Sequence, residues 1–185
     1  MALKAIIYKA KVSLSDLDHN IYSDHELTIA RHPSETEERM MIRLLAYVLN
    51  APENNDHGTL EFGKDMWEAD EPALSQHDLT GLLVHWIDLG QPDEKRLVRT
   101  CGRSRKVSVY SFANTAATWW AGLAGKFTRV QNLHVWQIPA AESQELGTLA
   151  DRSMSLTITL QDGVLFVEEG GRTVELHLAR LCGAE

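Results

Sequence analysis

The chain has 185 residues, of which 44% are hydrophobic and 24% are charged. This length predicts a single domain over residues 1–185, and the composition is typical of a soluble globular protein rather than of a disordered, collagen-like or disulfide-rich chain. No apolar run approaches the roughly 18–20 residues that span a bilayer, and lysines interrupt the apolar residues of segment 1–12, which argues against a signal peptide. Only two cysteines are present. We therefore expect a cytoplasmic protein with no membrane partner.

The charge is unevenly distributed along the chain. The formal net charge is -8, yet segment 95–106 contains six cations and no acid. The acidic balance argues against a protein that coats nucleic acid nonspecifically, whereas the basic segment is able to meet a phosphate backbone locally. The structural alternative is a solvated helix face followed by a loop.

The first part of the chain predicts a hairpin followed by a helix. Residues 3–13 and 21–30 have strand-like patterns on either side of a polar turn. Ser34 and Glu37 form a capping box, and the apolar residues that follow recur at helical spacing. These signals predict a helix over residues 34–49. Its buried stripe consists of Met41, Leu44, Leu45 and Val48.

Strands and helices alternate through the rest of the chain. Residues 82–89 form a mostly apolar run, which is typical of a central strand buried on both faces. Pro92 then permits a helix that stops at Gly102, and Asp162-Gly163 indicates a hairpin. The other predicted strands are 59–62, 107–112, 130–138, 155–160, 164–168 and 173–179, and the other predicted helices are 114–124 and 140–150. Together they predict an α/β (α+β) fold with a single mixed sheet, flanking helices and added antiparallel hairpins.

Two glutamates near the start of the first helix are candidate site residues. Glu38 lies three residues before Met41 and projects along the stripe that should be buried, where a carboxylate is costly unless it is paired, protonated or bound to a metal. Its structural alternative is an ion pair with a cation such as Arg43. Glu35 lies in the first turn, where the helix dipole already favours an acid.

Three further acidic residues stand in unusual settings. Asp88 nearly ends the apolar run 82–89, where α/β folds build sites, although it would also suit capping of the next helix. Asp70 and Glu71 precede a proline and suit a turn. Glu38, Asp70 (or Glu71) and Asp88 together form a candidate site for Mg²⁺ or Mn²⁺, because such ions prefer oxygen ligands and activate water for phosphodiester hydrolysis.

Several longer segments resemble the YaeQ family of bacterial proteins. They are HPSETEERMMIRLLA (32–46), DEP (70–72), WIDLGQPDEKRL (86–97) and the pair Trp119-Trp120, extended by MALKAIIYKAKV at the start and LADRSMSLTITLQDGVLFV (149–167). The resemblance covers nearly the whole chain. It implies a compact variant of the PD-(D/E)XK nuclease fold.

The nuclease superfamily places a glutamate on its first helix, an aspartate on its second core strand and (D/E)-x-K on its third. The resemblance assigns these roles to Glu38 (or Glu35), to Asp70 and to Asp88. Gly90 stands where the lysine of the motif is expected, and Gln91 follows one residue later. Lys95, or else Arg96 and Arg99, would reach back from the following helix. Arg96 and Arg99 are then the expected ligands of substrate phosphate.

Two functions follow as hypotheses. The first is a Mg²⁺-dependent phosphodiesterase that acts on DNA or RNA. The second is a nucleic-acid- or protein-binding module that has kept the fold and lost the chemistry, as the missing lysine and the acidic net charge suggest. A stable domain whose acids serve only as caps and ion pairs is the third alternative. We expect Trp119 and Trp120 to pack rather than to stack on bases.

Overall fold

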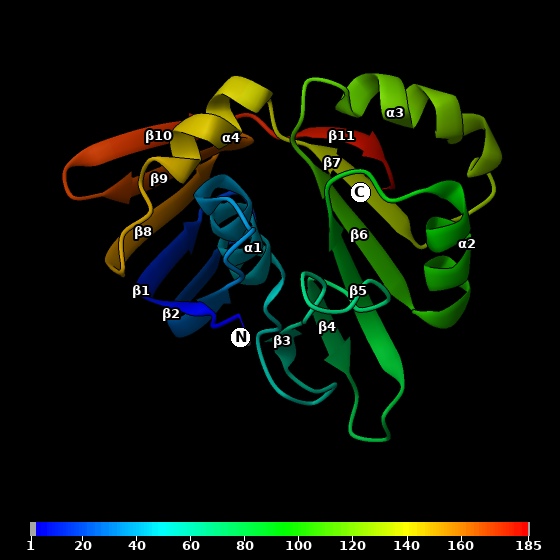
Figure 1. Ribbon diagram of the computed structural model, residues 1–185, viewed down its shortest axis with the longest axis horizontal. Helices are drawn as coiled ribbons and strands as arrows, with labels where there is room; N and C mark the ends of the chain where they lie inside the picture. Colours follow the sequence, from blue (N-terminus) through cyan, green and yellow to red (C-terminus); the bar gives the residue numbers. More distant parts are fainter. Residues whose placement is uncertain (1–2, 185) are drawn as a thin grey trace. The chain divides into compact units, whose positions relative to one another are not determined.

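The computed structural model describes residues 3–184, which form two compact units. Unit 1 contains the described residues up to Val48 together with Pro139–Leu178, and unit 2 contains Leu49–Ile138 and the described residues from Ala179 onward. Each unit is built around its own mixed sheet (Figure 1). The predicted α+β class is confirmed, whereas the prediction of a single sheet is wrong.

The sheet of unit 1 has five strands in the order β10-β9-β8-β1-β2. The predicted hairpin at the start of the chain is confirmed, and β1 also pairs in parallel with β8. The hairpin between β8 and β9 turns at Asp162-Gly163, both of which have a positive φ, as a two-residue turn of this type requires. The strands are β1 (Ile6–Asp16), β2 (Ile21–Arg31), β8 (Ser153–Gln161), β9 (Val164–Glu169) and β10 (Arg172–Leu176).

Unit 1 also contains helix α4 (Ala140–Gly147) and all but the last two residues of helix α1 (Glu37–Asn50). Helix α1 begins later than predicted, because the Thr36 hydroxyl rather than Ser34 accepts the first capping hydrogen bond, from the Arg39 N–H at 3.1 Å. The four residues of the predicted stripe are all buried. Gly147 permits a close approach of the two helices, since a Cβ there would lie 2.8 Å from the Cα of Glu38.

The sheet of unit 2 has six strands in the order β11-β7-β6-β5-β4-β3, of which β5, β6 and β7 are parallel. Strand β5 has neighbours on both sides and is buried over residues 85–88, which confirms the predicted central strand. The predicted last strand divides into β10 of unit 1 and β11 of unit 2. The strands are β3 (Leu60–Phe62), β4 (Leu74–His77), β5 (Leu83–Leu89), β6 (Lys106–Ser111), β7 (Leu133–Gln137) and β11 (Ala179–Cys182).

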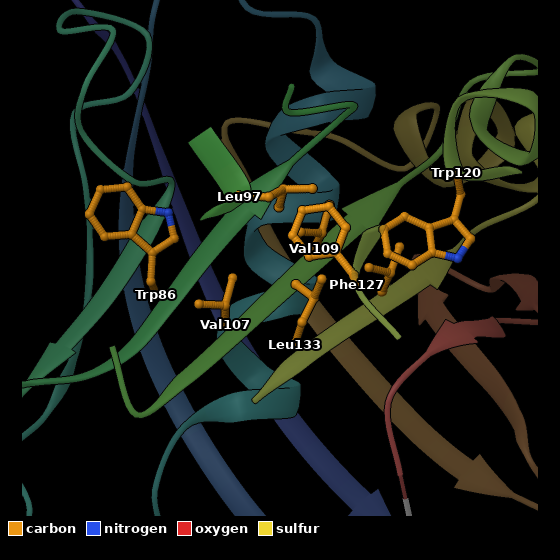
Figure 2. Packing of buried hydrophobic residues seen from close by; sticks show 8 residues of the cluster. Trp86, Leu97, Val107, Val109, Trp120, Phe127 and Leu133 are labelled. Atoms are coloured by element: carbon orange, nitrogen blue, oxygen red, sulfur yellow. The ribbon is translucent and has the colours of Figure 1, made fainter. Parts of the chain in front are cut away.

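One face of this second sheet packs against helix α2 (Glu94–Arg103), helix α3 (Ala116–Leu123) and the short 3-10 helix η1 (Ala124–Lys126). The buried cluster consists of Trp86, Leu97, Val107, Val109, Trp120, Phe127, Leu133 and Val135 (Figure 2). The indole N–H of Trp120 donates to the carbonyl of Leu181, and that of Trp119 donates to the carbonyl of Pro92. Both tryptophans therefore pack within unit 2, as predicted.

Candidate functional site around Arg96

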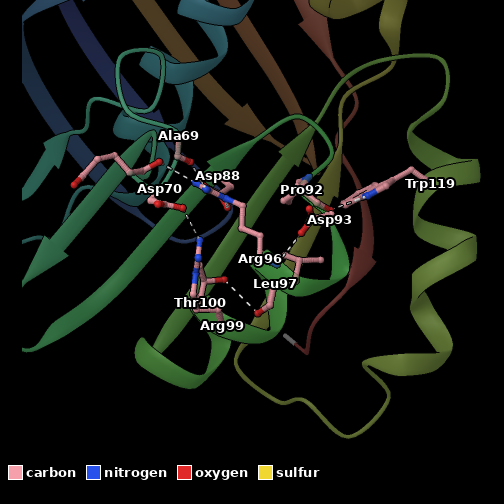
Figure 3. Close-up of polar contacts among 11 residues, drawn as sticks. Ala69, Asp70, Asp88, Pro92, Asp93, Arg96, Leu97, Arg99, Thr100 and Trp119 are labelled. Atoms are coloured by element: carbon pink, nitrogen blue, oxygen red, sulfur yellow. Dashed lines mark hydrogen bonds and ion pairs between the residues drawn. The ribbon is translucent and has the colours of Figure 1, made fainter.

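Asp88 on β5 is held by a two-point ion pair with Arg96 on α2 (Figure 3). The Arg96 Nε donates to Oδ2 of Asp88 at 2.8 Å, and Nη2 donates to Oδ1 at 2.9 Å. Asp88 is only 3% exposed. A buried carboxylate needs such a partner, because an unpaired charge is costly away from water.

The local sequence explains how Arg96 reaches this position. Gly90 follows β5 with a φ of +92°, a left-handed conformation that favours glycine. Asp93 then caps α2 by accepting a hydrogen bond from the Arg96 N–H at 2.8 Å, so Arg96 lies in the first turn of the helix. Its guanidinium lies over the Trp86 ring, 5.5 Å from the centroid. The glycine in place of the expected motif lysine is thus part of the turn that brings Arg96 to Asp88.

Arg96 also fixes the segment that precedes β4. Its Nη1 donates to the carbonyl of Ala69 at 2.6 Å and its Nη2 to the carbonyl of Glu71 at 2.8 Å. A guanidinium has five N–H donors, and four of those of Arg96 therefore form hydrogen bonds within unit 2. The hydrogen bond to Asp88 is the main cause that raises the pKa of Arg96, and the nearby carboxylates of Asp65 and Asp70 contribute in the same direction.

The other predicted site residues of unit 2 are exposed, unlike Asp88. They are Asp70, Gln91, Lys95 and Arg99. Arg99 donates to Asp70 at 3.2 Å, with side chains 42% and 89% exposed, so this pair contributes little. Gln91 donates to the Thr115 hydroxyl at 2.7 Å. Lys95 is exposed on α2. Asp88 and Asp70 thus bind two arginines of the same helix, Arg96 and Arg99 respectively.

Glu38 belongs to unit 1, whereas Asp70 and Asp88 belong to unit 2. Its side chain is half-buried, and its Oε1 accepts a hydrogen bond from the hydroxyl of Ser143 on α4 at 2.7 Å. Arg43 binds a different glutamate, Glu35, and the alternative that Glu38 pairs with a cation stays a prediction. The role of Glu38 as a metal ligand stays a prediction.

Glu35 forms a buried ion pair that the sequence analysis missed. Its two carboxylate oxygens accept from Arg39 Nη1 and from Arg43 Nη2, each at 2.7 Å. The Glu35 side chain is 0% exposed and that of Arg43 is 5% exposed. Arg39 and Arg43 share one face of α1, but Glu35 precedes the helix, so helical spacing alone did not point to this pair.

The carboxylates as they stand do not fit a divalent cation. Both oxygens of Asp88 already accept hydrogen bonds from Arg96, and a guanidinium occupies the position where a metal would neutralise the acid. Across residues 3–184, no group of three or more His, Cys, Asp or Glu side chains is arranged to hold a metal ion. In unit 2, the positive charge that balances the Asp88 carboxylate therefore comes from Arg96.

The helices of the described chain include none that is both long and apolar enough to cross a membrane. The fold and the site together define a mixed α+β protein with two sheets and an aspartate–arginine centre on the second sheet.

The family described as "YaeQ protein" matches residues 1–178. The chain is 41% identical over 180 residues to the YaeQ proteins of Escherichia coli (strain K12) and Salmonella typhi, with 96% of each chain covered. It therefore belongs to the YaeQ family, which confirms the resemblance found in the sequence.

Solved structures of this family have the same fold. The YaeQ protein from Xanthomonas axonopodis pv. citri matches with a TM-score of 0.91 and 38% identity, over 97% of this chain and 99% of that chain. The YaeQ protein from Pseudomonas syringae matches with a TM-score of 0.87 and 32% identity, over 97% of each chain.

Proposed function

We propose that this chain is a cytoplasmic nucleic-acid-binding protein that contacts phosphates through α2 and does not depend on metal catalysis. The observation that supports it is the exposed face of α2, where Lys95, Arg99 and Arg103 follow one another at intervals of four residues. Side chains at this spacing lie in a row, about 6 Å apart along the helix axis. Leu97 and Thr100 are buried on the other side.

Arg96 is a poor candidate for this role, although the sequence analysis grouped it with Arg99. Four of its donors bind Asp88, Ala69 and Glu71, and phosphate binding would compete with those contacts. Among residues 3–184, Arg99 forms its ion pair with the exposed Asp70, and exposed pairs of this kind are weak and screened by salt. We therefore assign phosphate binding to Lys95, Arg99 and Arg103, and we call these three residues the α2 row.

Charge reversal on this row is the test of the proposal. We expect the variant Lys95→Glu/Arg103→Glu to bind labelled oligonucleotides at least tenfold more weakly than the wild-type protein in fluorescence anisotropy titrations. Because each phosphate contact adds roughly 0.9 to the slope of log K against log salt on duplex DNA, and roughly 0.7 on single strands, the salt dependence should also fall by about one to two.

A matched variant separates the α2 row from the effect of net charge. Lys9→Glu/Lys64→Glu introduces the same charge change at two exposed lysines outside α2. We expect it to retain most of the affinity, with the salt slope unchanged. Equal losses in the two variants, or no binding by the wild-type protein to single- or double-stranded DNA or RNA, would rule out the α2 surface as the binding site.

A Mg²⁺-dependent nuclease is the second candidate, and the observation that favours it is that Asp70 and Asp88 both bind arginines of α2. It requires Arg96 to leave Asp88. Calorimetric titration of Mg²⁺ and Mn²⁺ distinguishes the candidates. A nuclease predicts metal binding that is lost in Asp88→Asn and metal-dependent cleavage of an oligonucleotide, whereas the binding module predicts neither in the wild-type protein.

A further inference from the structure

The sheet face of unit 2 that lies opposite α2 carries a separate set of polar residues. Alternate residues of a strand point to opposite faces. Trp86, Val107 and Leu133 belong to the cluster that packs against α2 and α3. Their neighbours His85, Lys106 and His134 therefore point to the other face, as does Ser108. Asp88 lies three residues after His85, so the Asp88–Arg96 pair and this second set lie on different faces of the same sheet.

The strand register brings this second set together. His85 on β5 lies opposite Lys106 on β6, and Ser108 on β6 lies opposite His134 on β7. The His85 Nε2 and the Ser108 hydroxyl share a hydrogen bond of 2.8 Å. Arg180 on β11 lies opposite Trp136 on β7, two residues after His134, with its guanidinium 4.9 Å from the indole ring. We call His85, Lys106, Ser108, His134 and Arg180 the β-face cluster.

The charges of the β-face cluster act on one another. Burial lowers the pKa of His85 to about 3, with further lowering by Lys106 and His134. Burial also lowers the pKa of His134, with contributions from Lys106 and Arg180. In the part of the chain that the structure describes, no carboxylate forms an ion pair with Lys106, His134 or Arg180. The cluster is thus a concentration of positive charge without an internal counter-ion.

We infer that the β-face cluster binds a phosphate group, either as free phosphate or as the terminal phosphate of a mononucleotide. Lys106 and Arg180 are exposed and supply two cations, which match a phosphate dianion, and partial burial lowers the pKa of Lys106. The half-buried imidazole of His134 offers a further hydrogen bond, whereas the buried hydroxyl of Ser108 stays in its hydrogen bond with His85. The phosphate remains accessible to solvent on the side of the two exposed cations. This inference uses none of the residues assigned to nucleic acid on α2, so the two proposals can fail separately.

Nuclear magnetic resonance titration of the whole protein tests this site, with inorganic phosphate and adenosine 5′-monophosphate as the probes. We expect both probes to shift the imidazole signals of His85 and His134, while the exposed His57 and His77 of the same unit serve as internal references. Equal affinities for the two probes would assign the site to free phosphate. Tighter binding of the mononucleotide would assign it to a nucleotide. No shift of either signal with either probe would overturn the inference.

Charge removal supplies the second arm of the experiment. We expect Lys106→Gln/Arg180→Gln to weaken phosphate binding at least tenfold, with the thermal unfolding curve used to confirm a folded protein. The matched variant Lys64→Gln/Arg129→Gln removes one lysine and one arginine from exposed positions of the same unit and should bind like the wild-type protein. Equal weakening by both variants would overturn the inference. The Lys106/Arg180 variant should keep its oligonucleotide affinity, because the α2 row is intact.

Discussion

Replacing Arg96 with methionine is expected to lower the free energy of unfolding by about 3 kcal/mol or more, because it leaves the buried carboxylate of Asp88 without its counter-ion. The methionine also leaves the carbonyls of Ala69 and Glu71 without their donor. Urea unfolding followed by circular dichroism measures the loss. The transition midpoint should fall while the slope of the free energy against urea stays the same, since the change affects stability rather than the surface exposed on unfolding.

Arg99 provides the matched control for this experiment. It lies three residues further along α2 and also pairs with an aspartate, but both side chains of that pair are substantially exposed. Arg99→Met should therefore cost less than about 1 kcal/mol. Similar losses in the two variants would contradict the view that Arg96 is the structural cation of unit 2.

Replacing Glu35 with glutamine is expected to have an effect of similar size, about 3 kcal/mol. The substitution keeps the shape of the side chain but removes the charge that faces Arg39 and Arg43. Because the Arg43 side chain is 5% exposed, its guanidinium would remain charged with little access to water. The same unfolding measurement applies, with Glu37→Gln as the control, since Glu37 is exposed in the first turn of α1 and should contribute less than about 1 kcal/mol.

A double-mutant cycle makes this second prediction specific to the ion pair. Glu35→Gln/Arg43→Met removes both partners, so the double variant should lose clearly less stability than the sum of the two single variants. Additive losses would indicate that the Glu35–Arg43 contact does not stabilise unit 1.

The sequence predicted the local elements well because their signals are local. The hairpin β1-β2, the central strand β5 and the turn at Asp162-Gly163 were recognised from alternation, a continuous apolar run and turn chemistry. The division into two sheets was missed because it depends on which strands pair. Lys9 of β1 pairs with Ser153 of β8, and no periodic pattern specifies a partner so distant in the sequence.

At the candidate site, too, the sequence indicated individual residues but not the residues that contact them in the fold. The apolar surroundings of Asp88 marked it as a candidate site residue, whose partner in the structure is Arg96. They did not identify that partner, since Arg96 reaches Asp88 only through the left-handed turn at Gly90 and the cap at Asp93. In unit 1, Glu35 was assigned to the first turn of the helix, whereas it precedes α1 and binds Arg39 and Arg43 from there.

The passage of the chain between its two sheets affects when each unit can fold during synthesis. Strand β1 pairs with β8, and the edge strand β11 of the six-stranded sheet comes only after β10 of the other sheet. The carbonyl of Leu181 on β11 also receives the indole N–H of Trp120. Neither unit is therefore complete until the last strands have left the ribosome. The β1–β2 hairpin can pair with its parallel neighbour β8 only after β8 has been synthesised. Such late pairing of distant segments slows folding.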